Sequence, residues 1–306
     1  MKLLKDKLYE SLLDDEEDLI NDNSALIDEY LKKYYSLKGT YIIKNGVVDV
    51  NGSINVTDKS ITQFTNGLFE FGEINGSFNA YSVRKLTTLK GAPKKIRFDF
   101  VCTDAELLTD LTGCPPHVGQ DLVISGCDGL KNLKGAPEYI GGSIYANACS
   151  SLTTLTDLPK YKNPLISVFL EDCSSLKSLK GLPAANEYSF FGCDISDIKY
   201  LQTLGLKSVG LLNLGYCYKL SSLEGCPETV SCLDCSDIKI KNFVGGPKQV
   251  LGNLYINDLN LESLDGFPNK VTGDIYAKRT KLSVNMLLQL SDFAKSQGVK
   301  LIRDKR

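Results

Sequence analysis

The sequence has little histidine, almost no net charge and no long hydrophobic run. Its 306 residues include one histidine, and 35 lysines and arginines stand against 37 acidic residues, for a formal net charge of −2. Because a protein that binds nucleic acid needs a basic surface that releases counterions, this balance argues against a general affinity for nucleic acid. Hydrophobic residues make up 42% of the chain, which is enough for a substantial buried core.

Charged residues interrupt every apolar stretch of the N-terminal segment MKLLKDKLYESLLDDEEDL. A secretory signal needs an uninterrupted apolar segment, and no later segment approaches the length that spans a membrane. We therefore expect a cytoplasmic protein without a membrane partner. In that compartment the ten cysteines are expected to be reduced thiols.

A repeat of roughly 22 residues runs through most of the chain. Its first part has the form Leu-x-x-Leu-x-Gly-x-Pro, as in LTTLKGAPKKI, LKNLKGAPEYI and LESLDGFPNKV. A short alternating segment such as GSIYANAC follows and often ends on cysteine. Alternation with a period of two predicts a half-buried strand, and Gly-x-Pro predicts a turn. Each repeat therefore predicts one coil, with a strand on one side and an irregular return on the other.

Aligning the repeats on the residue that ends each alternating segment gives one column of positions, of which six consecutive members are cysteine. Parallel side chains in a line present at most two ligands to one point and orient poorly for disulfides, so a zinc site and disulfides are the less favoured alternatives. We interpret the column as a ladder of small buried residues, repeated at the spacing of neighbouring strands, about 4.8 Å. The column is Lys59, Val83, Thr103, Cys127, Cys149, Cys173, Cys193, Cys217, Cys235, Leu259 and Thr280.

Signatures of catalysis are sparse. Cys114 and His117, in the phrase GCPPHVG, are the one candidate for a nucleophile with its base, but the equivalent loop at Cys226 has no histidine. We interpret Gly141-Gly142 and Gly245-Gly246 as coil turns that need positive φ, and not as phosphate loops. The scattered carboxylates form neither an acid–base pair nor a calcium loop. We therefore expect a protein that is not an enzyme, with no catalytic residue, cofactor or metal.

The repeats resemble those of leucine-rich repeat proteins. The phrase LKGAPEYIGGSIYANAC matches the short variety found in many bacteriophages and bacteria, in which Leu-x-Ser-Leu-x-Gly-x-Pro precedes Val-Gly-Gly and a short strand. The resemblance, over residues 47–281, implies an α/β repeat fold, a leucine-rich repeat solenoid with a curved parallel β-sheet of about 11 short strands. It also implies a protein partner on the concave face, and ladder side chains that meet backbone groups exposed by the turn. The phrases CSSLTTL and CSSLKSL are similar to repeats of bacterial surface antigens.

The two ends of the chain differ from the repeat, as expected where a solenoid must cover its core. Apolar residues at helical spacing predict helices over residues 2–19 and 24–36, the second beginning at Asn23 or Ser24. These helices are interpreted as a cap, or alternatively as a pair that binds a partner or oligomerises. A third helix is expected to stop at Gly298, before a basic tail in solvent. The expected organisation is a helical cap at 1–40, a solenoid at 41–284 and a helical cap at 285–306.

Residues between the inward positions of each strand are expected to face away from the core. The predicted outward column includes Asp99 and Ser231. Aromatic side chains are costly to leave in water and dominate binding energy at interfaces, although they also favour strands and pack along sheets. The candidate partner-binding residues are Tyr145, Phe169, Glu171, Asp172, Phe191 and Tyr216, with a second group of Tyr255 and Tyr276.

The sequence thus predicts a non-enzymatic scaffold for protein–protein interaction, for which a phage origin is one interpretation. The resemblance implies that the cytoplasm in question is that of a bacterium or a phage-infected host cell. The alternative is a structural component of a virion or cell-surface assembly, held by its helical ends. The identity of the protein partner and the oligomeric state do not follow from one sequence.

Overall fold

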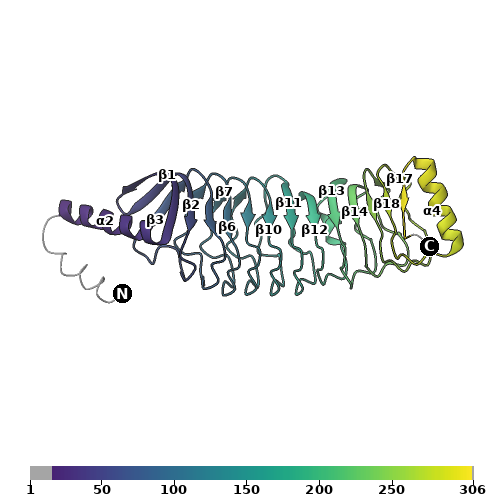
Figure 1. The fold of residues 1–306 in the computed structure, drawn as a ribbon, viewed down its shortest axis with the longest axis horizontal. Helices are drawn as coiled ribbons and strands as arrows, with labels where there is room; N and C mark the ends of the chain where they lie inside the picture. The colour runs from purple at the N-terminus through teal and green to yellow at the C-terminus, as the bar shows by residue number, and fades with distance from the viewer. Residues whose placement is uncertain (1–15, 305–306) are drawn as a thin grey trace.

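The structure, a computed structural model, describes residues 16–304. The chain forms a parallel β-solenoid of about 12 turns with few helices. Figure 1 shows a long rod of stacked coils, with one helix at each end. Within the described residues, none of the helices is long and apolar enough to cross a membrane.

The helices are α2 (Glu16–Tyr34), α3 (Tyr200–Thr203) and α4 (Val284–Gln297). The strands of the first half are β1 (Tyr35–Lys44), β2 (Val47–Val56), β3 (Glu70–Ile74), β4 (Phe78–Ala80), β5 (Lys95–Ile96), β6 (Phe100–Cys102), β7 (His117–Val118), β8 (Leu122–Val123), β9 (Tyr139–Ile140) and β10 (Ile144–Tyr145). Those of the second half are β11 (Leu165–Phe169), β12 (Ala185–Ser189), β13 (Ser208–Asn213), β14 (Thr229–Asp234), β15 (Gln249–Val250), β16 (Leu254–Tyr255), β17 (Lys270–Val271), β18 (Ile275–Tyr276) and β19 (Leu301–Ile302).

Many coils contribute two short strands, so the described residues form a 19-stranded sheet and not one of about 11 strands. In one such coil β9 pairs with β7, and β10 pairs with β8 and β11. Gly141 and Gly142 lie between β9 and β10, and neither has the positive φ expected of it. Of the other predicted pair, Gly245 has a positive φ, at +81°, and Gly246 does not. A Cβ on Gly141 would lie 2.1 Å from the carbonyl oxygen of Gly119, so close approach of the coils requires glycine there.

The Gly-x-Pro turn places its glycine in the left-handed region against the preceding coil. Gly135 has a φ of +85°, and a Cβ on it would lie 2.6 Å from the carbonyl oxygen of Leu111. Gly181 repeats this arrangement against Leu155, with a φ of +94° and a separation of 2.4 Å. Only glycine satisfies both conditions, which explains why this position is glycine in so many repeats.

A second left-handed residue occurs at the corner after the strand in ten coils. Asp is well represented there because its short polar side chain tolerates positive φ better than most. The φ values lie between +53° and +72° for Ser82, Asp104, Gly126, Ala148, Asp172, Gly192, Tyr216, Asp237, Asp258 and Arg279.

The strand register corrects the alignment of two coils. Val101 pairs with Asn79 and Val123, and Asp234 pairs with Asn213 and Tyr255, so these two residues occupy the outward column. The assignments of Asp99 and Ser231 to that column are wrong. These two errors arise because the repeats were aligned on the residue that ends each alternating segment. The strands themselves pair in a different register in these two coils.

The same shift changes the ladder. In the corrected register Ala105 and Ile238, both buried, take the positions that the alignment gave to Thr103 and Cys235. The amide of Leu108 bonds to Ala105 as that of Leu130 bonds to Cys127. Cys235 instead lies directly after β14 as an inward residue of the strand segment. The uninterrupted cysteine ladder therefore has five members, which are Cys127, Cys149, Cys173, Cys193 and Cys217.

The N-terminal end differs from the expected pair of helices. α2 continues through Asn23 and Ser24, so the predicted helix start at these residues is wrong, and residues 2–15 lie outside the described part. At Tyr35 the chain enters β1, which pairs antiparallel with β2 and crosses the expected boundary at residue 40. The hairpin turns at Asn45 and Gly46, both with positive φ, which is typical of a type I′ turn.

At the C-terminal end, α4 stops as predicted. Ser283 caps its first turn by accepting a hydrogen bond from the amide of Met286 at 3.2 Å, and Gly298 adopts a φ of +70° after the last turn. The predicted free tail is wrong in part, because β19 pairs in parallel with β18. This added strand continues the parallel β-sheet of the solenoid beyond α4.

Candidate protein interface

Three aromatic clusters lie on the surface formed by the outward strand residues. The first joins Tyr145 of β10 to Phe169 of β11, with ring centroids 5.4 Å apart and an interplanar angle of 84°. Both side chains are half-buried. Glu171, two residues after Phe169, accepts a hydrogen bond from Ser189 Oγ at 2.6 Å, and Asp172 is exposed at the next corner.

The second cluster joins Phe191 to Tyr216, with ring centroids 4.8 Å apart, and extends to Tyr218 at 6.0 Å from Tyr216. Phe191 lies in the column of Glu171 and not in that of Phe169. A Cβ on Gly215 would lie 3.3 Å from the Phe191 ring, so this glycine leaves space for the ring. Tyr218, which is 52% exposed, was not among the predicted residues, although the phrase GYCYKL signals it by a second tyrosine.

The third cluster stacks Tyr255 of β16 on Tyr276 of β18, with centroids 4.5 Å apart and an interplanar angle of 16°. Asn253 Nδ2 donates a hydrogen bond to the Tyr255 hydroxyl at 3.1 Å. The structure therefore keeps the predicted separation into two groups and divides the first of them into two clusters. The predicted role of these residues in binding stays a prediction.

The ladder cysteines contact backbone carbonyls of the preceding coil. Their thiols donate weak hydrogen bonds, at 3.3 Å from Cys149 to Ile124, 3.1 Å from Cys173 to Ala146, and 3.0 Å from Cys217 to Phe190. These contacts confirm the interpretation of the ladder as buried residues that meet exposed backbone. Desolvation by burial raises the pKa of the Cys127 and Cys217 thiols to about 12, which keeps them protonated near neutral pH.

The pair of Cys114 and His117 is divided between core and surface. Cys114 is a buried core residue whose pKa burial raises, while the His117 ring stacks on Tyr139 at 4.4 Å and lines a surface groove. Burial thus opposes the thiolate that a nucleophile requires. The described side chains, from residue 23 to residue 304, also contain no cluster of three or more His, Cys, Asp or Glu that could hold a metal ion.

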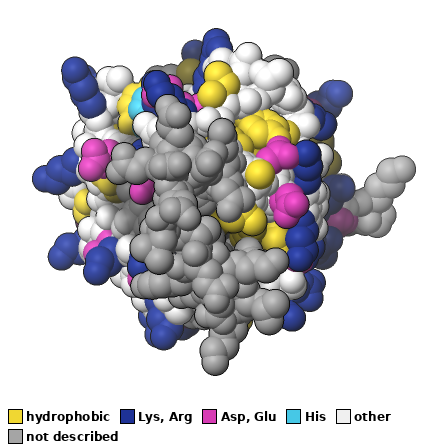
Figure 2. Space-filling view, turned by 90° about the vertical axis from the view of Figure 1, so that its left-hand side faces the viewer, with side chains coloured by type: hydrophobic (Ala, Val, Ile, Leu, Met, Phe, Trp, Pro, Cys, Tyr) yellow, Lys and Arg dark blue, Asp and Glu magenta, His cyan; other side chains and the backbone are white. Residues whose placement is uncertain are grey.

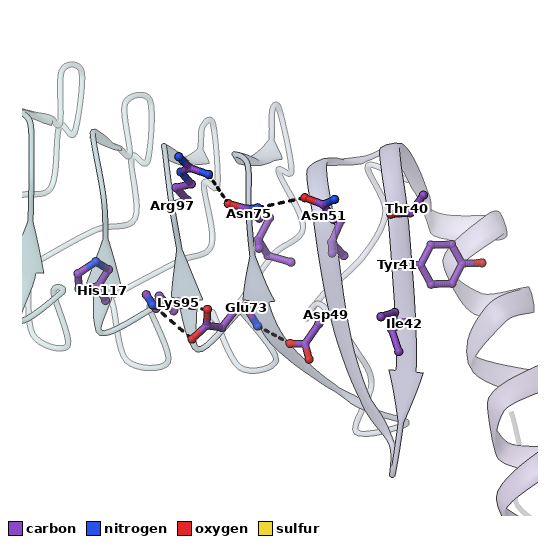
Figure 3. Close-up of a pocket in the computed structure, with 12 residues that line it drawn as sticks. Thr40, Tyr41, Ile42, Asp49, Asn51, Glu73, Asn75, Lys95, Arg97 and His117 are labelled. Carbon is purple, nitrogen blue, oxygen red and sulfur yellow. Dashed lines mark hydrogen bonds and ion pairs between the residues drawn. The ribbon is translucent and has the colours of Figure 1, made fainter.

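That groove, of about 760 Å³, lies where the N-terminal hairpin meets the first coils. Figure 3 shows β1 as one wall and the side chains of the next strands as the floor. Asn75 Nδ2 donates to Asn51 Oδ1 at 3.0 Å, and Arg97 donates to Asn75 Oδ1 at 2.9 Å. Asn51 and Asn75 each begin an Asn-Gly-Ser phrase, and the two phrases are 24 residues apart. This spacing, close to the repeat length, is the signal in the sequence from which the stacking of the two side chains could have been predicted.

Among the charged side chains of the groove, Lys95 and Glu73 form an ion pair, while Asp49 and Arg97 bond to neutral groups. Lys95 Nζ contacts Glu73 Oε1 at 3.3 Å, and the Glu73 amide donates to Asp49 Oδ1 at 2.7 Å. Tyr41 points away from the floor and its hydroxyl bonds to Asp28 of α2. Exposed pairs of this kind contribute little to stability, and they leave few free groups to recognise a ligand.

No protein-family model, curated protein or solved structure matches this chain. Neither fold family nor function therefore passes to it from a relative, and the surfaces described above carry the functional interpretation.

Proposed function

We propose that the protein is a non-enzymatic scaffold of the leucine-rich repeat type, which binds a protein partner on its strand surface. The observation that carries the proposal is the set of aromatic clusters on outward strand positions. The binding residues are Tyr145, Phe169, Glu171, Asp172, Phe191, Tyr216, Tyr255 and Tyr276. Rigid aromatic side chains on a regular sheet lose little conformational entropy on binding and are frequent interface anchors.

The two terminal helices act as caps of the solenoid in this proposal. α4 directs Met286, Leu290 and Ala294 into the core, and Phe293 packs against Phe267 with ring centroids 5.3 Å apart. At the other end, Ile27 and Leu31 of α2 are fully buried. Apolar contacts at both ends support helices that cover the open ends of the core.

The placement of the thiols argues against one kind of catalysis, that by a cysteine nucleophile. Eight of the ten cysteines are buried, and Cys226 and Cys232, the other two, have pKa values that desolvation raises. A cysteine nucleophile is expected to be accessible and to have a lowered pKa.

The test is a pull-down from the native cytoplasm with the wild type and with the triple variant Tyr145→Ala, Phe169→Ala, Phe191→Ala. We expect the triple variant to lose a stoichiometric partner that the wild type retains. The matched control is Tyr139→Ala with Phe98→Ala, because these exposed aromatics lie outside the three clusters. If both variants retain every partner, the assignment is wrong, and recovery of an assembled particle would favour a structural component of a virion or surface assembly.

A further inference from the structure

The strand face is strongly acidic in the middle of the solenoid. We define the strand face by four positions in each of seven coils: a first residue, the residues two and four positions after it, and the corner residue five positions after it. The second of these positions is the outward column that contains Val101 and Asp234. The first positions are Asp99, Asp121, Ser143, Ser167, Glu187, Leu211 and Cys232. None of the strand-face positions is lysine or arginine. The carboxylates of the strand face are Asp99, Asp104, Asp121, Glu171, Asp172, Glu187, Asp234 and Asp237.

These carboxylates have no cationic partner, in contrast to several acids elsewhere on the solenoid. Glu224 pairs with Lys199 at 2.8 Å, Glu228 with Lys248 at 2.7 Å and Glu262 with Lys241 at 3.1 Å. In the described part of the chain, no ion pair includes a strand-face carboxylate. The end-on view in Figure 2 shows lysine and arginine side chains projecting from much of the outline of the rod.

Neutral groups hold several strand-face carboxylates in fixed positions. Ser167 Oγ donates to Glu187 Oε2 at 2.8 Å, and the Ser143 amide donates to Asp121 Oδ1 at 2.7 Å. Such hydrogen bonds orient a carboxylate without supplying a positive charge, so a cation that approaches the strand face is attracted by carboxylates that have no cationic partner.

The aromatic clusters lie among these charges. Tyr145 and Phe169 precede Glu171 along the face, and the Phe191–Tyr216 cluster follows it. A guanidinium or ammonium group over such rings gains a cation–π interaction in addition to the ion pair. The rings also offer apolar contact area to the stems of long basic side chains.

We infer that the strand face binds a lysine- or arginine-rich segment of the partner protein, extended along the solenoid. The inference rests on the proposed function and adds the chemistry of the partner. Seven coils at about 4.8 Å per step span about 29 Å, which an extended peptide covers with roughly nine residues. Carboxylates with aromatic clusters between them match the charged heads and apolar stems of such a segment.

The test measures fluorescence anisotropy of labelled nona-arginine and nona-glutamate peptides on the full chain at low and high NaCl. The strand-face variant is Glu171→Gln, Glu187→Gln, Asp234→Asn, and the control of equal charge change is Glu224→Gln, Glu228→Gln, Glu262→Gln. We expect the wild type to bind nona-arginine, with affinity that falls as salt rises, and not nona-glutamate. The strand-face variant should weaken binding about ten-fold or more, and the control about two-fold or less.

Several outcomes would overturn the inference. Absence of nona-arginine binding would do so, as would equal weakening by the two variants, which would show an effect of net charge alone. Sedimentation showing self-association that the strand-face variant removes would assign the face to a second copy. Urea midpoints near that of the wild type establish that both variants fold. A natural partner lost by the aromatic triple variant but kept by the strand-face variant would leave the proposed function standing without the inference.

Discussion

At the scale of single residues, two of the ladder cysteines, Cys127 and Cys217, are expected to make the free energy of unfolding depend on pH in the alkaline range. Burial raises the pKa of Cys127 and Cys217 to about 12, while the unfolded chain has ordinary thiols that ionise near pH 9. Because the folded pKa is the higher one, the contribution of these thiols to stability is complete below about pH 9. It is lost as the pH rises from there toward 12.

We predict that Cys217→Ala reduces the steepness of the fall in urea midpoint between about pH 9 and 11, because it removes one thiol that ionises only in the unfolded state. The control is Val209→Ala, which also truncates a buried residue but removes no titrating group. Parallel pH profiles for Cys217→Ala and the wild type would contradict the prediction.

The left-handed corner gives a second prediction at this scale. Ala148 adopts a φ of +54°, where a non-glycine residue is strained by about 1–2 kcal/mol, so Ala148→Gly should raise the free energy of unfolding by about 0.5–1 kcal/mol after the entropy of glycine is offset. The reverse change, Gly126→Ala, should lower it, because its Cβ would lie 2.3 Å from Asp104 Oδ1. Urea denaturation measures both, and a destabilised Ala148→Gly variant would refute the strain argument.

At the scale of elements, Ser283 determines where α4 begins. Its side chain accepts the Met286 amide, so Ser283→Ala should cost about 1 kcal/mol and increase hydrogen exchange in the first turn of α4. Ser296→Ala is the control in the same helix, since Ser296 is exposed and its hydrogen bonds are local, donated to the Phe293 carbonyl and accepted from Gln297 Nε2. Equal exchange rates in the two variants would show that the cap contributes nothing.

The repeat phrase was sufficient to predict the coils, because it combines a period-two strand with a glycine that must adopt positive φ. It was not sufficient to predict the register, that is, which residue of each coil pairs with which residue of the next. Ala105 and Ile238 are buried at their ladder positions as the cysteines are, so an alignment that looked for cysteine or a similar residue chose Thr103 and Cys235 instead. The register is determined by the backbone pairing between coils.

The N-terminal hairpin and the groove were harder to predict for a related reason. Asn45-Gly46 carries a clear turn signal, but the aromatic residues before it fit a helical spacing as well as the start of β1. The groove depends on the hairpin lying beside the first coils. The aromatic residues of the interface were predictable individually, because outward positions follow from alternation, whereas their division into clusters depends on the column in which Phe191 lies.

At the scale of the whole molecule, the rod is quasi-one-dimensional, because each coil contacts mainly its neighbours. Leu212 of β13 is fully buried between Tyr188 and Leu233 of the adjacent strands. Its replacement by alanine is expected to cost about 2–5 kcal/mol, and in a solenoid this loss should remain local.

We therefore predict that Leu212→Ala increases hydrogen exchange in β12, β13 and β14 while β4 and α4 keep the protection of the wild type. Hydrogen exchange with mass spectrometry under native conditions resolves these segments. Ile54→Ala near the other end is the matched control, since Ile54 is also fully buried and should affect β2 and β4 instead. A uniform loss of protection along the chain in either variant would mean that the coils unfold as one cooperative unit, and nearest-neighbour stability would then fail as a description of the rod.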